Sequence, residues 1–232
     1  MLSAAERHPR LAEPVPAGRV RVDMHLHSMW SGDCTTTPDE LAEAVTASGL
    51  DVLCLTDHNG LAGALRFAET GELGCRVVVG EELRTGAGEI IGLFLSEHLP
   101  FGLGPVDAVT RIREQGGLVY IPHPFDPVRN CLNEDVLRGL AADGGIDAVE
   151  VCNAKTSLAS LNRKAAEFAA EFGLAGGAGS DSHVPDALGA AFVEIDDFTD
   201  AMSFLTALRG ATVHGRHFEP PRPWRPRIVP AT

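Results

Sequence analysis

Short apolar runs typical of buried strands alternate along most of this 232-residue chain with longer segments that carry helix start and stop signals. Such alternation predicts a parallel sheet in which a helix follows each strand, because parallel strands need a crossover connection. About seven such units are expected, and that number closes into a barrel more readily than it forms an open sheet. The alternation therefore predicts an α/β barrel.

The expected elements follow one another through short connections. Strands are expected over 19 to about 27, 51–56, 76–79, 118–121, 146–151, 174–178 and 191–195, with a short one at 212–214. The run 89–95 is expected to pair with 76–79 as an antiparallel hairpin. Helices are expected over 38–48, 61–70, 105–115, 134–141, 158–172 and 199–208. The first of these has the clearest signals, since Thr37, Pro38 and Glu40 make a capping box and Gly49 follows its last turn.

In six of these units a polar side chain suited to an active site comes just after the strand. His25 and His27 are two residues apart on an extended segment, so their side chains share one face. Because the carboxyl ends of barrel strands meet at one rim, the later groups are expected to join them. The candidate metal ligands are His25, His27, Asp33, His58, Glu82, His123, Asn153, Asp181 and His183. Imidazoles mixed with carboxylates suit Zn, Mn or Fe, and a carboxylate such as that of Glu82 can bridge two ions.

Composition narrows the class of protein. A formal charge of -13 argues against broad electrostatic binding to nucleic acid or to an anionic membrane surface. No run approaches eighteen apolar residues and the first 18 residues lack the apolar segment of a signal peptide, so neither a membrane span nor export is expected. Five cysteines without a Cys-x-x-Cys pair fit reduced thiols, so a cytoplasmic location is expected. Residues 1–18 are expected to form a loose arm, 19–215 the barrel, and 216–232, with five prolines, an extended tail.

The motifs resemble those of the PHP family, the polymerase and histidinol phosphatase domain. The similar stretches are Asp23-Met24-His25-Leu26-His27-Ser28 with Ser31-Gly32-Asp33, Leu55-Thr56-Asp57-His58, Gly80-Glu81-Glu82-Leu83, Ile121-Pro122-His123-Pro124, Glu150-Val151-Cys152-Asn153 and Gly179-Ser180-Asp181-Ser182-His183. They occur in the family's order, and the resemblance covers residues 20–215. The resemblance implies a distorted (β/α)7 TIM-like barrel with two or three divalent metal ions at the carboxyl ends of its strands, and phosphoester hydrolysis as the commonest activity.

The resemblance also implies how the ligands divide. His25, His27, Glu82 and Asp181 are expected at one metal, Glu82 and His123 at a second, and Asp33, His58 and His183 at a third. Two features depart from the usual pattern. Ser31-Gly32-Asp33 stands where Ser-Asp-Gly is usual, so Asp33 is displaced by one residue. Asn153 stands where many members have His or Cys, which predicts a weaker second metal.

Alternative roles stay open for several of these residues. Asp33 is alternatively a loop cap, His58 an outer donor, and Asn153 an Asx-turn residue without metal contact. Glu81 is expected to be solvated, because strand alternation turns it away from Glu82. The cations Arg84, Arg129 and Lys155 follow strands at the same rim and are expected to bind a substrate phosphate, with surface salt bridges as the alternative.

The expected activity is metal-dependent hydrolysis of a small phosphorylated metabolite or nucleotide by metal-activated hydroxide. The residues assigned to catalysis are His183, Glu82 and Asp181, with His183 or solvent protonating the leaving oxygen. No GxSxG nucleophile motif is present, which favours direct attack by water. The alternatives are a phosphodiesterase or exonuclease on short oligonucleotides, a related hydrolase acting on carbon, and a non-catalytic, metal-stabilised binding domain. A small phosphorylated substrate is the expected partner, and the sequence leaves the oligomeric state open.

Overall fold

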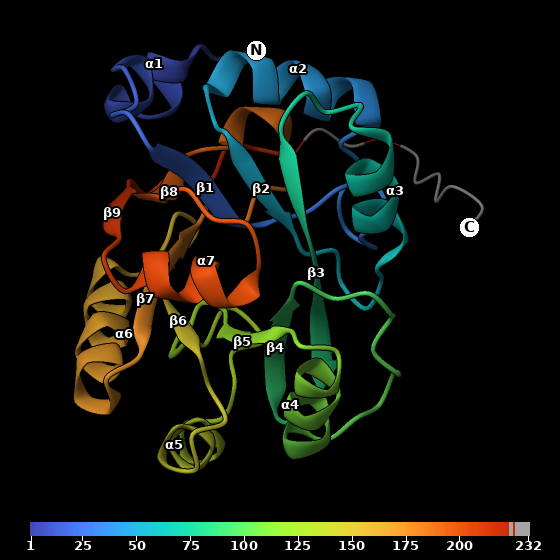
Figure 1. Cartoon of the computed structure of the whole chain (residues 1–232), viewed down its shortest axis with the longest axis vertical. Coiled ribbons are helices and arrows are strands. Elements are labelled where there is room, and N and C mark those ends of the chain that lie inside the picture. Colours follow the sequence, from blue (N-terminus) through green and yellow to red (C-terminus); the bar gives the residue numbers. More distant parts are fainter. Residues whose placement is uncertain (223–224, 226–232) are drawn as a thin grey trace.

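The structure, a computed structural model, describes residues 1–222 and 225, in which nine strands form one curled sheet (Figure 1). The strand order is β7-β6-β5-β4-β3-β2-β1-β8-β9. The strands are β1 (Arg19–Leu26), β2 (Val52–Leu55), β3 (Arg76–Thr85), β4 (Gly88–Leu93), β5 (Leu118–Ile121), β6 (Ala148–Asn153), β7 (Ala175–Gly179), β8 (Ala191–Asp196) and β9 (Thr212–Gly215). The predicted α/β fold with a nearly closed barrel is confirmed.

The residues after β7 nearly close the barrel by returning to β1. The backbone N–H of Asp181 donates to the carbonyl of His25 at 2.7 Å, and that of His27 donates to the carbonyl of Ser182 at 2.9 Å. Leu26 and Ser182 form a parallel bridge at the same place. The ends of β1 and β7 therefore lie side by side, although 157 residues separate Asp23 from Ser180, whose N–H donates to the Asp23 carboxylate.

The sheet is mixed, which differs from the parallel sheet expected from strand–helix alternation. Strand β4 runs antiparallel to both β3 and β5, so the predicted hairpin is present. Its partner is the second half of β3, residues 80–85, whereas residues 76–79 pair with β2. Strand β8 runs antiparallel to β1 and carries β9 on its other edge. The pairs β1–β2, β2–β3, β5–β6 and β6–β7 are parallel.

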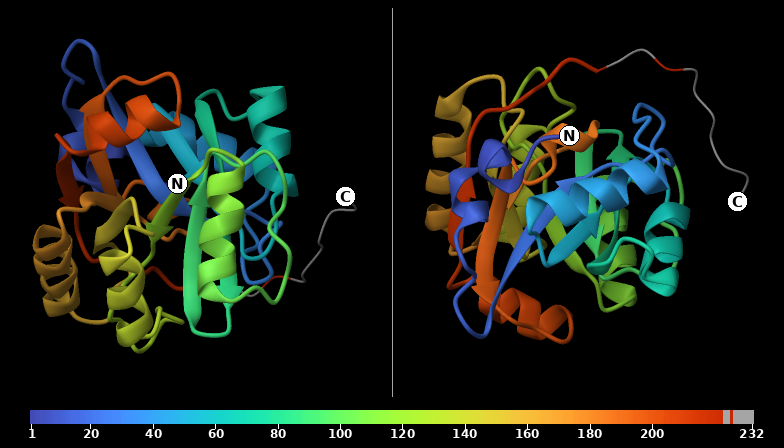
Figure 2. Two further views of the ribbon diagram at one scale, coloured as in Figure 1. Left: turned by 60° about the horizontal axis from the view of Figure 1, so that its bottom comes forward. Right: turned by 90° about the horizontal axis from the view of Figure 1, so that it is seen from above.

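The helices lie outside the strands, as Figure 2 shows from two directions. They are α2 (Pro38–Ser48), α3 (Ala62–Thr70), α4 (Pro105–Glu114), α5 (Glu134–Ala142), α6 (Ala159–Phe172) and α7 (Ala201–Leu208). Helix α2 begins as predicted, because Thr37 and Glu40 form a reciprocal capping box and Pro38 occupies the first turn. It ends at Gly49, whose φ of 73° is readily adopted only by glycine.

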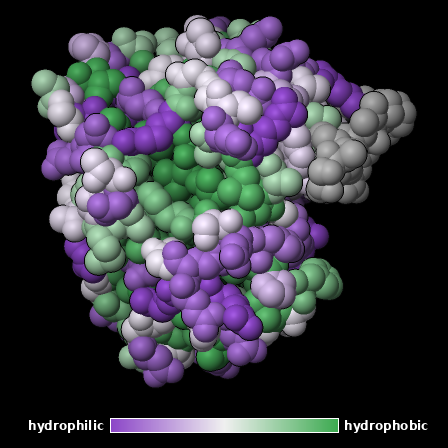
Figure 3. All heavy atoms as spheres, turned by 45° about the vertical axis from the view of Figure 1, so that its right-hand side comes forward, coloured by the Kyte–Doolittle hydropathy of each residue, from purple (hydrophilic) through white to green (hydrophobic). Residues whose placement is uncertain are grey.

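Three groups of buried apolar side chains hold the barrel together. One lies between the strands and α7 and includes Met24, Tyr120 and Phe204. A second lies between β4–β6 and helices α4–α6, and a third between β1–β3 and helices α2 and α3. The face drawn in Figure 3 carries polar side chains in an upper and a lower band with apolar side chains between them.

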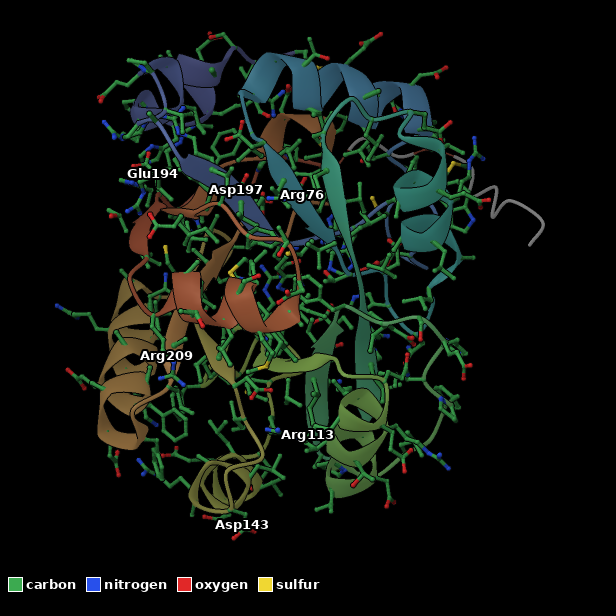
Figure 4. The ribbon with its side chains drawn as sticks, in the orientation of Figure 1. Arg76, Arg113, Asp143, Glu194, Asp197 and Arg209 are labelled. Carbon is green, nitrogen blue, oxygen red and sulfur yellow. The ribbon has the colours of Figure 1, made fainter. Side chains whose placement is uncertain are left out.

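The start of β3 is fixed to the loop between β8 and α7. Arg76 and Asp197, which lie next to each other in Figure 4, form an ion pair with 2.7 Å between Nη2 and Oδ1. Arg76 also donates to the carbonyl of Phe198 at 2.7 Å, and its guanidinium lies 4.0 Å from the ring centre of the same residue. These contacts hold the start of β3 in place. Glu82 lies further along the same strand, so its position is fixed as well.

The first residues differ from the loose arm that was expected. A short helix, α1 (Ala4–Arg7), and a 3₁₀ turn, η1 (Pro9–Ala12), pack against the barrel. Arg7 is fully buried and donates to the carbonyls of Leu2 and Leu188 at 3.0 and 3.1 Å. These hydrogen bonds from the buried guanidinium hold the segment against the barrel. The sequence did not predict this, because an arginine near prolines is also common in exposed, unstructured segments.

Two further expectations concern the C-terminal tail and membrane-spanning helices. Residues 216–222 and Arg225 run against the barrel, whereas residues 223–224 and 226–232 of the predicted tail lie outside the described residues. Within the described part, no helix is long and apolar enough to cross a membrane.

Candidate metal centre

Side chains from the carboxyl ends of β1, β2, β3, β5 and β7 meet at one end of the barrel. His25 lies in β1 and His27 directly follows it, and their Nε2 atoms are 3.2 Å apart. His58 follows β2, Glu82 lies in β3, and His123 follows β5. Asp181 and His183 follow β7, which reaches the same place because its end pairs with β1.

The Glu82 carboxylate lies at the centre of this cluster. Its Oε2 is 3.3 Å from Nε2 of His25, 3.3 Å from Nε2 of His27 and 3.0 Å from Nδ1 of His58. Its Oε1 is 3.1 Å from Nε2 of His123. Burial alone would raise the pKa of this carboxyl, but the neighbouring His25 and His58 hold that pKa well below its usual range. Glu82 is therefore ionised, and each of its oxygens faces a different set of imidazoles.

Asp181 and His183 complete two sides of the cluster. Oδ1 of Asp181 lies 3.4 Å from Nε2 of His27 and 3.9 Å from that of His25. Nε2 of His183 lies 3.0 Å from Oδ2 of Asp33, and the same oxygen lies 3.7 Å from Nε2 of His58. Asp33 thus borders the cluster from a loop, with 41% of its side chain exposed.

Two of these residues have left-handed backbone conformations. His123 has a φ of 27° and Asp181 a φ of 49°. Side chains other than glycine rarely adopt such angles, and they persist where the surrounding contacts fix them. Here the N–H of His123 donates to Glu150 at 2.6 Å, and that of Asp181 donates to the His25 carbonyl. The backbone is therefore bent at the points where the strands deliver these two side chains.

The donor set fits divalent cations. Among the residues that the structure describes, four groups have ligand atoms within 4.8 Å of one another: His25, His27 and Asp181; His25, Glu82 and His123; His27, His58 and His183; and His58, Glu82 and Glu89. Nδ1 of His58 is buried, lies 3.0 Å from Glu82 and makes no hydrogen bond within the described chain. A ring nitrogen and a carboxylate oxygen that face each other without a hydrogen bond are stabilised by a cation between them.

Glu150 belongs to the site and was missed from the sequence. It is fully buried in β6, and its Oε1 lies 3.2 Å from Nδ1 of His25. It also accepts hydrogen bonds from the N–H of His123 and the side-chain amide of Asn153. A carboxylate at Nδ1 directs Nε2 of His25 toward Glu82 and Asp181, as outer carboxylates do for metal-binding histidines. An acidic residue inside an apolar strand was the available signal.

Glu89 was missed as well. It lies at the start of β4 with 3% of its side chain exposed, 3.6 Å from Nε2 of His123 and 3.7 Å from Nδ1 of His58. Arg84 donates to it at 2.9 Å across the β3–β4 hairpin. Glu89 thus stands beside Glu82 and His123, where the sequence supplied only two ligands for a second metal. A glutamate preceding the apolar run 90–95 was the signal.

Three expectations need correction. Asn153 is not directed at the cluster, because its Oδ1 accepts from the N–H of Lys155 at 2.8 Å and its Nδ2 donates to Glu150. It is the Asx-turn residue of the alternative interpretation. Lys155 lines the cavity from a buried position rather than from an exposed rim, since its Nζ lies 3.1 Å from both Asp181 Oδ1 and His183 Nδ1. Glu81 is buried rather than solvated, and it accepts hydrogen bonds from His98 and the N–H of Leu99.

A cavity of 270 Å³ opens onto the cluster. Its wall includes Asp33, His58, Glu82, Glu89, His123, Asp181 and His183, together with the cations Arg84, Arg129, Lys155 and Arg222. Arg84 is half exposed and paired with Glu89. Arg129 lies across the opening and donates to the carbonyl of Lys155 at 2.9 Å. Of these four cations, Arg222 was not predicted, because it belongs to the segment expected to be an extended tail.

Comparison with known proteins shows which family models and which relatives this chain matches. The model of the PHP domain matches residues 23–122, and that of a PHP-associated region matches residues 159–213. An uncharacterized protein of Methanocaldococcus jannaschii is 36% identical over 180 residues, which are 77% of this chain and 71% of that protein.

Two solved structures share the fold at lower identity. A two-domain protein from Bacteroides vulgatus, described as containing a predicted PHP-like metal-dependent phosphoesterase, superposes with a TM-score of 0.69 at 20% identity, over 89% of this chain and 68% of that one. An amidohydrolase from Chromobacterium violaceum, solved with bound sulfate and no metal, gives a TM-score of 0.62 at 19% identity, over 81% and 96% of the two chains. Together, the two family matches span more than half of the sequence, and the chain belongs to the PHP family.

Proposed function

We propose that this protein is a metal-dependent phosphoesterase that hydrolyses a small phosphorylated metabolite or nucleotide. The observation that carries the proposal is the position of Glu82, whose two oxygens face four imidazoles at the floor of a cavity lined by cations. A carboxylate shared between metal ions, with cations for the substrate's negative charge, is the arrangement that phosphoester hydrolysis needs.

The ligands divide into three groups that would hold two or three divalent ions such as Zn, Mn or Fe. His25, His27 and Asp181 form one group, and Glu82, His123 and Glu89 lie beside it. His58, His183 and Asp33 border the opening. When bound, such ions supply Lewis acidity, which neutralises phosphoryl charge and makes hydroxide available near neutral pH.

The other side chains bind and orient. Glu150 fixes the ring of His25 through Nδ1, and Ser31 does the same for His27, with 3.2 Å between its Oγ and Nδ1. The buried ammonium of Lys155 faces the cavity beside Asp181, where it can bind a phosphoryl oxygen. Arg129 offers guanidinium N–H groups at the opening. The leaving oxygen takes its proton from water, or from His183 where that ring does not hold a metal ion.

The size of the cavity and the net charge of the whole chain favour a small substrate. A volume of 270 Å³ accommodates a phosphoryl group and part of a metabolite rather than a large ligand. The net charge of -13 opposes a long polyanion, so a phosphorylated small molecule is favoured over extended nucleic acid.

The five cysteines, none in a disulfide, fit a cytoplasmic location.

The experiment is phosphate release from a panel of phosphomonoesters and short diesters, measured with and without added Mn or Zn. We expect metal-dependent release that His123→Ala and Asp181→Ala each abolish while the protein stays folded. Arg129→Ala should raise KM about tenfold or more with little change in the melting temperature, because it removes a charge-assisted contact to phosphate. Activity retained in both ligand variants would contradict the proposal, and an unchanged KM would assign Arg129 to the surface.

A further inference from the structure

Residues 216–222, which we call the C-terminal strap, run from β9 along the outside of the barrel (red in the right-hand view of Figure 2). The N–H of Arg216 donates to the carbonyl of Ala190, and the N–H of Phe218 donates to that of Ala154, both at 2.9 Å. Phe218 also packs against the apolar group around β1. Because Ala154 precedes Lys155, these contacts fix the strap beside the site.

The end of the strap brings Arg222 to the cavity. Its Nη1 donates to the backbone carbonyl of Asp33 at 3.2 Å and lies 3.7 Å from the Asp33 carboxylate. That carboxylate contacts His183 and borders the metal-ligand cluster. A guanidinium has five N–H donors and 40% of this side chain is exposed, so donors remain for an anion in the cavity.

Glu219 places a carboxylate from the strap against Arg129. Its Oε1 lies 3.1 Å from Nη2 of Arg129, on the guanidinium that is held from below by the Lys155 carbonyl. The pair is partly exposed at Glu219, and ion pairs of this kind are weak. Glu219 therefore neutralises part of the charge with which Arg129 would attract an anion in the cavity.

We propose that the C-terminal strap is part of the substrate site, in which Arg222 binds an oxyanion of the substrate and Glu219 weakens the attraction of Arg129 for that anion. The proposal deepens the proposed phosphoesterase function and rests on it for the identity of the substrate. The two strap residues have opposite effects on anion binding: Arg222 strengthens it, and Glu219 weakens it. A strap that only supports the fold has no reason to give opposite effects.

The test is calorimetric titration of inorganic phosphate into the full chain loaded with Mn, at fixed ionic strength. Arg222→Gln should weaken phosphate binding about tenfold, since one charge-assisted contact is lost. Glu219→Gln should tighten phosphate binding about two- to fivefold, because the charge of Arg129 is no longer partly neutralised. Arg222→Lys, which keeps the charge, should recover part of the loss.

Matched controls separate these effects from general changes in charge. Arg225→Gln removes the next arginine along the chain, which pairs with Glu40 on α2. Glu134→Gln removes an exposed glutamate that pairs with Lys164. Both controls should bind phosphate within about twofold of the unaltered chain, as expected for exposed pairs away from the cavity.

The proposal would be overturned by equal affinities for Arg222→Gln and Arg225→Gln, by weaker binding in Glu219→Gln, or by no phosphate binding in the unaltered protein. Loss of Mn from Arg222→Gln would also overturn it, since Arg222 would then act by positioning Asp33. If phosphate binding shifts as expected but the unaltered protein hydrolyses no phosphate ester, the strap remains an anion-binding element and the proposed function fails. The two failures are thereby distinguishable.

Discussion

Oε1 of Glu150 lies 3.2 Å from Nδ1 of His25, inside the barrel and out of contact with solvent. This contact fixes which ring nitrogen of His25 faces the cluster, because the nitrogen near Glu150 carries the proton and the other is left to bind. The orientation of His25 is thus set by Glu150, a buried residue that does not line the cavity.

Glu150→Gln tests this role. The amide keeps the shape of the side chain but loses the charge, so we expect metal affinity to fall about 10- to 100-fold, as is typical when an outer partner of a histidine ligand is changed. Competition with a fluorescent chelator measures the affinity. Glu171→Gln, an exposed change on α6, is the control, and equal affinities for the two variants would remove Glu150 from the site.

Gly179→Ala tests how closely β7 approaches His25. A Cβ at Gly179 would lie 2.3 Å from the Cβ of His25 and 2.8 Å from its backbone nitrogen. We expect a loss of about 1–3 kcal/mol in the free energy of unfolding, as overpacking typically causes, together with weaker metal binding.

The matched control is Gly139→Ala, which lies within α5 with nothing within 4 Å of the added carbon. That change should raise the free energy of unfolding by about 0.5–1 kcal/mol, because alanine favours a helix over glycine. Denaturant titration compares the two variants. Equal changes in both would show that the contact between β7 and His25 is not tight.

Glu89→Gln tests the carboxylate that supplements His123. The variant should lose one metal ion per chain, or bind it at least about tenfold more weakly, because a neutral amide replaces an anionic ligand. Elemental analysis after dialysis measures the loss. Glu97→Gln, an exposed change in the loop after β4, should keep the full metal content, and full content in Glu89→Gln would leave Glu89 as the ion-pair partner of Arg84 alone.

Asn153→Ala tests whether Asn153 acts through hydrogen bonds rather than as a metal ligand. Removing the acceptor for Lys155 N–H and the donor to Glu150 should lower the free energy of unfolding by about 1–3 kcal/mol, because buried partners lose their hydrogen bonds. The number of metal ions at saturation should stay the same. A lower number would make Asn153 a ligand after all.

Most of the barrel followed from local signals. The Thr37–Glu40 capping box, the alternation of strand and helix, and the 89–95 hairpin each depend on neighbouring residues, and the structure has all three. The antiparallel placement of β8 beside β1 depends on contacts between distant segments. Local periodicity carries no information on strand direction. For that reason a parallel sheet was expected, although the sheet is mixed.

The site was predictable to the extent that its residues follow strands. His25 lies at the end of β1, and His27, His58 and His123 follow their strands; the barrel brings all four within a few ångströms of Glu82. Glu150 and Glu89 lie within strands among apolar neighbours, so only the folded sheet reveals which carboxylates face the cluster. Arg222 reaches the cavity through a long return of the chain, which no spacing rule predicts.

The most direct test of the central claim is the metal content of the protein purified without added metal, compared with that of Glu82→Gln. Glu82 contacts four imidazoles, so its neutralisation should affect more than one ion. The account predicts two or three divalent ions per chain in the unaltered protein and at most one in the variant, with both folded by circular dichroism. Less than one ion per chain in the unaltered protein after incubation with Mn or Zn, or equal content in the two proteins, would contradict a metal centre built around Glu82.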